Sequence, residues 1–265
     1  MRQEPVGEKL LFPSSPARTV CGFSIARKRD VARRNERQTP CPSKVRRLFL
    51  AIWALGNLGL VACGGGDPAS TSGGYSTTFD ETENPISEGG RWSNNGQNWT
   101  FVQTANGIAY GTNGAADTYD DSYAYLAGFG ANQQAEAVVY RSATLSGDPH
   151  EVELLLRWAD SPGIARGYEC GFSHLGAVVI VRWNGPFGNF TLIGSGGLGR
   201  PLVSGDVVKA TIVGNLISVY VNGAPVAQAS DSTWSDGQPG IGFFRRTRGA
   251  SSDLGFASFS ASSLP

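Results

Sequence analysis

The segment "GDVVKATIVGNLISVYVNGAPVAQAS", Gly205 to Ser230, decides the fold class. Apolar and polar residues alternate on both sides of Gly214-Asn215, and again on both sides of Asn222-Gly223. A period of two is typical of a half-buried β-strand, and Gly/Asn pairs between two such runs mark two-residue hairpin turns. The segment therefore predicts three consecutive antiparallel strands.

Other segments show the same pattern. "HEVELLLRW", His150 to Trp158, places Val152, Leu154, Leu156 and Trp158 on one predicted face, and "AVVIVRW", residues 177–183, is a short apolar strand. Asn106-Gly107 separates "WTFVQT" from "IAYGT" as a further hairpin signal. No segment has a sustained helical period, and 36 glycines suit many tight turns. We expect an all-β protein, an antiparallel β-sandwich or jelly roll.

The stretch "RRLFLAIWALGNLGLVACGGGD", Arg46 to Asp67, has the features of an export signal. Two arginines precede an apolar run, Leu48 to Ala62, which is shorter than the roughly 20 residues that a membrane-spanning helix needs. Leu60-Val61-Ala62-Cys63 resembles the lipobox of bacterial lipoproteins, in which the cysteine is lipidated and becomes the first mature residue. The resemblance implies export and a lipid anchor on a bacterial membrane. A short core helix that ends at a cysteine is the alternative.

These signals predict four regions along the chain. Residues 1–44 are basic and polar, and we interpret them as an over-extended leader before a true start at Val45; a genuine disordered leader is the alternative. Residues 45–62 are the predicted signal peptide. Residues 63–78 are rich in Gly, Ser and Thr and predict a flexible tether. Residues 79–265 form the predicted sandwich domain.

The charge and the cysteine content of the residues after Cys63 argue against two features, a nucleic-acid partner and an internal disulfide. The chain has 22 basic and 22 acidic residues, of which 12 and 4 precede Cys63, so the remainder carries 10 and 18 and a net charge of −8. Nucleic-acid binding needs a basic surface, so the sequence argues against a nucleic-acid partner. Cys170 is the one cysteine after Cys63, which excludes a disulfide within the domain.

The final third of the chain resembles concanavalin A-like lectin/glucanase sandwiches, a group that includes laminin-G-like modules. The resemblance rests on "GDVVKATIVGNLISVYVNG", Asp231, "GQPGIGFF" at Gly237 to Phe244 and "GFASFSA" at Gly255 to Ala261. It implies the fold more than the function, because glycosidases, polysaccharide lyases, lectins and adhesion modules all share it. Glucanases of this group carry Glu-x-Asp-x-x-Glu on one strand, and this chain has no match. The nearest pair, Glu151 and Glu153, is expected on a solvated strand face, so no catalytic residue is assigned.

Three functions follow from these features. The first is carbohydrate binding without catalysis by a membrane-anchored lipoprotein. The second is a glycoside hydrolase or polysaccharide lyase with unrecognised catalytic residues. The third is a structural or adhesive surface lipoprotein. The sequence favours the first, because the anchor and the sandwich are recognisable while the catalytic motifs are not.

Arginines and tryptophans are the candidate carbohydrate-binding residues. The resemblance places the central strands on a concave sugar groove, where Arg157 and Arg182 would offer planar donors to sugar hydroxyls. The alternative is that each arginine forms a surface ion pair with Glu151, Glu153 or Glu169. Rings near Gly/Asn/Ser-rich turns can stack on sugars or fill the core, and these are Trp92, Trp99, Trp183 and Trp234.

The stretch "DTYDDSYAY", Asp117 to Tyr125, is the candidate metal segment. Asp117, Asp120 and Asp121 are hard oxygen donors of the kind that Ca²⁺ accepts, so a structural calcium ion is one interpretation. A solvated acidic loop is the other. The sequence indicates no further cofactor.

The anchor generates a testable prediction. Replacing Cys63 by serine removes the thiol that carries the lipid, so Cys63→Ser should move the protein from the detergent phase to the aqueous phase in phase-partition experiments. Unchanged partitioning would contradict the lipoprotein interpretation.

Overall fold

A computed structural model describes residues 73–94, 100–112, 121–143, 145, 149–186, 188–245 and 250–265. The predicted leader, signal peptide and lipidation site Cys63 lie outside the described residues, and so do Trp99, Asp117 and Asp120. The regular elements of the described residues are all β-strands, which confirms the all-β prediction. Within these ranges no helix has the length and apolar character that crossing a membrane requires.

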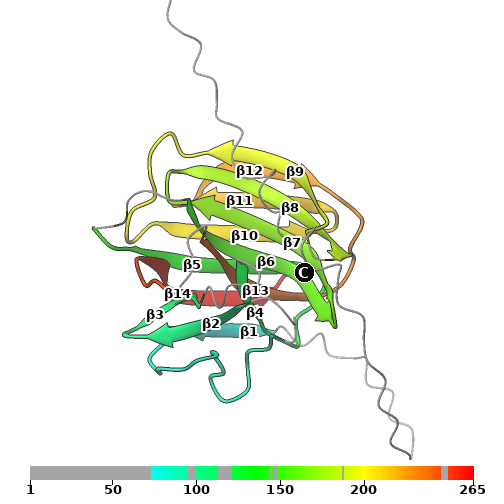
Figure 1. Ribbon diagram of the computed structural model, residues 1–265. Helices are drawn as coiled ribbons and strands as arrows, with labels where there is room; N and C mark the ends of the chain where they lie inside the picture. The colour runs from blue at the N-terminus through cyan, green and yellow to red at the C-terminus, as the bar shows by residue number, and fades with distance from the viewer. Residues whose placement is uncertain are drawn as a thin grey trace, which may run out of the picture.

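The strands form two layers that overlap in Figure 1. One layer, named sheet A, runs in the spatial order β12 (Ala224–Ser230), β11 (Leu216–Val221), β10 (Val207–Val213), β5 (Gln133–Arg141), β14 (Leu254–Ser263), β3 (Ile108–Gly111) and β2 (Thr100–Ala105), with β1 (Gly74–Thr77) also paired to β14. The other layer, named sheet B, runs in the order β4 (Asp121–Tyr125), β13 (Gln238–Arg245), β6 (His150–Ser161), β7 (Ile164–Ser173), β8 (Ala177–Pro186) and β9 (Phe190–Gly197).

Pairing among these strands is antiparallel except at one place, where β2 lies parallel to β4 and joins the two layers. The three hairpins that the sequence predicts are all present. Gly214-Asn215 connects β10 to β11, Asn222-Gly223 connects β11 to β12, and Asn106-Gly107 connects β2 to β3. Asn106 and Asn222 both adopt positive φ, which is the conformation that such turns require.

The hydrophobic core lies between the two sheets. Alternate residues of each strand point inward, so sheet B contributes residues such as Leu154, Cys170 and Ile180, while sheet A contributes residues such as Ala137 and Val219. A second, smaller cluster lies on the outer face of sheet B and consists of Tyr123, Leu155, Trp158, Ala165, Val181 and Trp183. The outer face of sheet B is therefore much more apolar and buried than a solvated strand face, which makes it the face of interest.

The folded domain starts earlier than the sequence predicts. The predicted tether ends at residue 78, but Gly74–Thr77 form strand β1, which pairs with β14 from Gly74↔Ser262 to Thr77↔Phe259. The Tyr75 ring packs edge-on against Trp92 at 5.6 Å between ring centroids, and the Trp92 indole N–H donates to the Tyr75 hydroxyl at 2.9 Å. The Ser/Thr-rich composition of this segment did not predict a strand. The strand is held by main-chain pairing with β14 and by the ring of Tyr75, which composition does not reveal.

Tyr75→Ala tests whether β1 belongs to the folded domain. The substitution removes the ring contact and the hydroxyl acceptor of Trp92, so we expect a loss of about 2 kcal/mol in the free energy of unfolding, measured by chemical denaturation. Ser76→Ala on the same strand is the control and should change it by less than about 0.5 kcal/mol, because Ser76 is exposed. Equal stability of both variants would contradict a structural role for β1.

Candidate functional site

Three carboxylates converge on the outer face of sheet B. Glu151 and Glu153 are two residues apart on β6, and Glu169 lies on β7 opposite Leu155, so strand pairing brings them together. One carboxylate oxygen from each lies within 4.8 Å of the others. Glu153 and Glu169 are almost completely buried and Glu151 is nearly so. The prediction of a solvated strand face for Glu151 and Glu153 is therefore wrong.

Glycines make room for these acids. A Cβ atom at Gly242 of β13 would come within 2.4 Å of a Glu153 oxygen, and one at Gly171 of β7 would lie 3.5 Å from Glu151 and 3.6 Å from Glu169. A glycine inside a strand often marks a place where another group must approach closely. The Trp183 indole N–H donates to Glu169 at 2.7 Å, which fixes the orientation of that carboxylate.

A β-bulge at Arg157 places Trp158 on the same outer face. The register between β6 and β7 shifts between Leu156 and Ala159, and Arg157 has a φ of 48°. The extra residue reverses the alternation of the strand. Trp158 therefore shares the outer face with Leu155 instead of the inner face with Leu156. The predicted face for Trp158 is therefore wrong. Its ring packs against Tyr123 at 5.4 Å and Trp183 at 6.2 Å between centroids.

Arg157 itself is a buried structural residue. Its side chain donates to the carbonyl oxygens of Ala131, Trp234 and Gly214, each at 2.8 Å. Burial lowers the pKa of its guanidinium below the ordinary value. Every guanidinium nitrogen of Arg157 is thus bonded to the protein backbone. The expected placement of Arg157 in a sugar groove is wrong, and so is the alternative ion pair with a glutamate.

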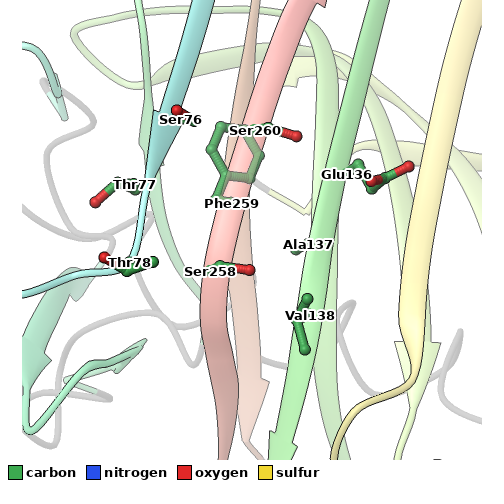
Figure 2. A pocket seen from close by; sticks show the side chains of 9 residues that line it. All are labelled: Ser76, Thr77, Thr78, Glu136, Ala137, Val138, Ser258, Phe259 and Ser260. Atoms are coloured by element: carbon green, nitrogen blue, oxygen red, sulfur yellow. The ribbon is translucent and has the colours of Figure 1, made fainter.

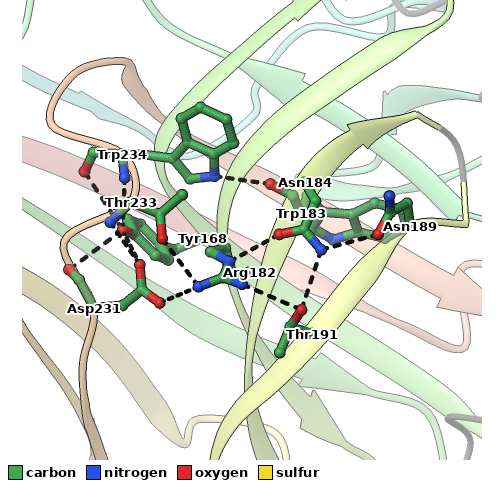
Figure 3. A network of polar contacts seen from close by, with 9 residues as sticks. All are labelled: Tyr168, Arg182, Trp183, Asn184, Asn189, Thr191, Asp231, Thr233 and Trp234. Carbon is green, nitrogen blue, oxygen red and sulfur yellow. Dashed lines mark hydrogen bonds and ion pairs between the residues drawn. The ribbon is translucent and has the colours of Figure 1, made fainter.

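Arg182 lies at one end of the sandwich and faces the space between the two sheets. There it contacts the loop of residues 231–237 (Figure 3). It pairs across the strands with Tyr168, whose ring belongs to the core between the sheets. It forms an ion pair with Asp231 at 2.6 Å and donates to Asn184 at 2.8 Å and to Thr233 at 3.0 Å. Arg182 therefore does not lie on the outer face of sheet B, and its carboxylate partner is none of the three predicted glutamates.

The surroundings of Asp231, the carboxylate that Arg182 contacts, favour its ionised form. Burial alone would raise the pKa of Asp231, but hydrogen bonds from Thr233, Tyr168 and Arg182 outweigh burial and leave the pKa below its usual range. The loop is further fixed by the Trp234 indole, which donates to the Trp183 carbonyl at 2.8 Å. Contacts from Tyr168, Arg182 and Trp183 of sheet B thus hold the loop that carries Asp236.

A pocket of about 310 Å³ opens at the edge of the outer face, where the 231–237 loop meets β4, β6 and β7. Aromatic and polar side chains both line it. Its lining includes Tyr125, Phe129, Trp158, Asp160, Arg166, Asp236 and Gln238. Gln238 accepts a hydrogen bond from the Phe129 backbone at 3.0 Å, which ties the segment before β5 to β13.

Asp160 is the most strongly oriented acid of this pocket. The Tyr123 hydroxyl donates to one of its oxygens at 2.5 Å and the Tyr125 hydroxyl to the other at 2.7 Å. Burial, together with the hydrogen bond to Asp160, raises the pKa of Tyr123 far above its ordinary value. The tyrosine therefore keeps its proton and remains a donor to Asp160.

Arg166 supplies the positive charge of the pocket. It contacts the Asp236 carboxylate at 3.2 Å and lies over the Trp234 ring at 5.0 Å from its centroid. Asp236 is largely exposed, so this ion pair contributes at most about 1 kcal/mol to stability. The pair serves instead to place a guanidinium and a carboxylate at the pocket rim.

A second groove of about 320 Å³ lies on sheet A, across β1, β14 and β5 (Figure 2). Hydroxyl groups dominate its lining, with Ser76, Thr77, Thr78, Ser258 and Ser260, and Glu136 adds one carboxylate. The only aromatic residue there, Phe259, is buried in the core between the sheets. This groove therefore lacks a ring on which a ligand could stack.

The other residues that the sequence predicted for a site lie in different parts of the fold. Trp92 fills the core beside Tyr75 and Phe259, which matches its alternative role. Trp234 is on the 231–237 loop, and Trp183 is buried on the outer face. Asp121 is a buried residue of β4, so it does not lie on a solvated loop, and within the described ranges the only group of three or more potential metal-ligating residues is Glu151, Glu153 and Glu169.

Sequence reasoning missed the pocket residues Asp160, Arg166 and Asp236. The only local feature that could have indicated this pocket is the pair of alternating tyrosines, Tyr123 and Tyr125, which share one face of β4. Their partner Asp160 is 35 or more positions away in the sequence. Strand pairing, rather than any motif, brings these groups together.

Comparison with known proteins adds to this geometry. No protein-family model and no curated protein matches the chain. One similar solved structure comes from work on endo-acting O-glycanases of human gut microbiota. Its TM-score is 0.50 and its identity 10%, and the alignment covers 72% of this chain and 99% of that one. A κ-carrageenase from Zobellia galactanivorans has a TM-score of 0.49, 11% identity, and covers 75% and 98%.

A third similar structure is the carbohydrate-binding module CBM66 from Bacillus subtilis, with a TM-score of 0.47, 14% identity, and coverage of 67% of this chain and 95% of that one. The fold is a concanavalin A-like β-sandwich. At these identities the likeness concerns the fold alone. The function must therefore be argued from the site.

Arg157→Met tests the structural role of the buried arginine. Three carbonyls would lose their donor, so we expect a loss of about 3 kcal/mol in the free energy of unfolding and a fall of about 6–12 °C in melting temperature. Arg91→Ala, at an exposed position, is the control and should leave both nearly unchanged. A melting temperature within about 2 °C of the wild type for Arg157→Met would return this residue to the list of candidate ligand-binding groups.

Proposed function

We propose that this protein is an exported, lipid-anchored protein that binds carbohydrate without catalysis, through the pocket lined by Tyr125, Phe129, Asp160 and Arg166. The observation that carries the proposal is the composition of this pocket, which combines aromatic rings with oriented hydrogen-bonding groups. Small-molecule sites are typically concave and apolar with a few well-placed polar groups.

Each part of the pocket has a task in sugar binding. The half-buried rings of Tyr125 and Phe129 offer apolar surface to the C–H face of a sugar ring. Asp160 accepts hydrogen bonds from sugar hydroxyls, while Arg166 and Gln238 can donate to them. Because two tyrosines already fix Asp160, little side-chain freedom is lost when a ligand binds.

The anchor is the second half of the proposal. The lipobox-like Leu60-Val61-Ala62-Cys63 supports attachment to a bacterial membrane, and the Gly/Ser/Thr-rich segment before β1 supports a spacer between membrane and domain. A domain held in this way would present its pocket to polysaccharides outside the cytoplasm. Export also agrees with the acidic charge of the residues after Cys63.

Glycoside hydrolysis is a second candidate, favoured by the cluster of Glu151, Glu153 and Glu169. Retaining glycosidases use two carboxyl groups about 5–5.5 Å apart, one as nucleophile and one as acid/base. The three glutamates here approach within 4.8 Å. Their deep burial favours binding over hydrolysis, since a substrate bond must reach both carboxylates.

A glycan panel tests the proposal. The wild type should bind at least one oligosaccharide class in calorimetric titration, and Phe129→Ala and Arg166→Ala should each weaken binding about tenfold or more. Lys209→Ala, a charge removed from sheet A, is the control and should bind as the wild type does.

Three results would redirect the assignment. Wild-type affinity in both pocket variants, with unchanged melting temperatures, would exclude this pocket. Release of reducing ends that Glu153→Gln abolishes would favour hydrolysis. Binding to no glycan would favour a structural or adhesive role.

A further inference from the structure

We propose that the pocket lined by Phe129 and Gln238 lies at the membrane-facing end of the domain, and that its partners are glycans attached to the membrane that carries the protein. This inference rests on the proposed function, because it uses the lipid anchor and names the kind of glycan that the same pocket takes. Three observations carry it: where the chain enters the domain, how far that point is from Cys63 along the sequence, and how long the domain is.

The first described residue of the domain, Gly73, lies beside the pocket. A Cβ atom at Gly73 would be 3.2 Å from the Phe129 ring and 2.7 Å from the Gly128 carbonyl oxygen. The Gly73 carbonyl oxygen accepts a hydrogen bond from the Ser263 N–H at 2.8 Å, and the Ser263 hydroxyl accepts one from the Gly130 N–H at 2.9 Å. The chain therefore enters the domain in contact with a pocket-lining residue.

Hydrogen bonds join this entry point to the other parts of the pocket end. The Asn132 side chain accepts a hydrogen bond from the Gly214 N–H in the β10–β11 hairpin at 2.9 Å. The Gln133 side chain donates to the carbonyl oxygen of Gly237 in the 231–237 loop at 2.6 Å. The entry point, this hairpin and this loop thus form one end of the sandwich.

The sequence limits how far this end can lie from the lipid. Gly73 is ten positions after Cys63. At about 3.3–3.6 Å per residue, ten residues reach at most about 36 Å, however they are arranged. The pocket end therefore stays close to the bilayer when Cys63 carries a lipid.

The length of the domain favours one orientation over the other. Strand β5 runs from Gln133 at the pocket end to Arg141 at the opposite end, and its 9 residues span about 27 Å at about 3.4 Å per residue. To turn the opposite end toward the bilayer, the segment before Gly73 would have to extend over most of its reach, which costs conformational entropy. The orientation with the pocket end toward the membrane lacks this cost.

A pocket in this place meets the glycans of its own membrane before any others. A short link between two binding partners raises the effective concentration of one for the other to about the millimolar range. The anchored protein and a lipid-attached glycan share one surface, so even a weak site would be occupied. Free polysaccharides and the glycans of a second cell lack this advantage.

Energy transfer to the bilayer tests the orientation. Asn215→Cys and Ala224→Cys place a donor dye beside the two turns that flank β11, about 20 Å apart along the strand, with Asn215 at the pocket end. Cys170 is fully buried and the proposed lipid blocks Cys63, so neither takes the dye. The vesicles contain phosphatidylethanolamine and phosphatidylglycerol, with an acceptor dye on the lipid headgroups. The full lipidated protein should show higher transfer efficiency from Asn215→Cys than from Ala224→Cys, and equal or reversed efficiencies would overturn the orientation.

Competition within one membrane tests the partner. The probe is the oligosaccharide that binds most tightly in the glycan panel, coupled to phosphatidylethanolamine. The same oligosaccharide in free form is titrated into vesicles that hold both the wild type and the coupled probe. Its apparent affinity should be about tenfold or more weaker than when the coupled probe is in separate vesicles. Phe129→Ala should lose binding in both arrangements, whereas Ala224→Ser, at the opposite end, is the control and should behave as the wild type does.

The two proposals fail in different ways. Equal affinities in the two arrangements, with binding that Phe129→Ala abolishes, would overturn the membrane-attached partner and leave carbohydrate binding intact. Failure of the wild type to associate with vesicles would overturn the lipid anchor, and with it this inference. Absence of binding to every glycan of the panel would overturn both proposals before the competition is measured.

Discussion

The guanidinium of Arg157 is the interaction on which the arrangement of this sandwich end depends. It extends from the central strand β6 of sheet B and bonds three carbonyls, at Ala131 before β5, at Gly214 in the β10–β11 hairpin and at Trp234 in the 231–237 loop. One side chain thus joins sheet B to two parts of sheet A and to the loop that connects the sheets. A hydrophobic residue could fill the same space, but it could not hold three carbonyls in fixed directions. The cost of burying this charge is offset by complete hydrogen bonding, because each nitrogen of the guanidinium has an acceptor.

The pocket is a consequence of that arrangement. The bulge at Arg157 requires close approach by neighbouring backbone, and a Cβ at Gly237 would come within 2.2 Å of the Arg157 carbonyl group. Asp236, Gly237 and Gln238 line the pocket together with Trp158, which the bulge places on the outer face. The same bulge that contacts the loop therefore also supplies an aromatic residue of the pocket lining. The proposed ligand binding would therefore be coupled to stability at this end of the molecule, and a variant at Arg157 is expected to disturb both.

The outer face of sheet B combines two kinds of acid site with different chemistry. Glu151, Glu153 and Glu169 are buried side by side, with glycines opposite them that leave room for their oxygens. Asp160 instead sits at a partly exposed edge and is oriented by two tyrosine hydroxyls. A substrate bond cannot easily reach a buried cluster, whereas an accessible carboxylate beside aromatic rings suits recognition. The exposed edge is the better candidate for ligand binding because a ligand can reach it without rearrangement of the sheet.

The sequence by itself determined the strands with clear alternation, the three hairpin turns and the all-β class, because alternation and turn residues act over a few neighbouring positions. It also indicated the export signal and the candidate lipid site. Only the tertiary structure decided which residues meet: Asp160 with Tyr123 and Tyr125, Glu169 with Glu153, and Arg182 with Asp231. Alternation predicts a face only while a strand stays regular, and the extra residue at Arg157 reversed it, so that Trp158 moved outward and Arg157 became buried. Such a bulge is stabilised by partners distant in the chain, which is why no local pattern could reveal it.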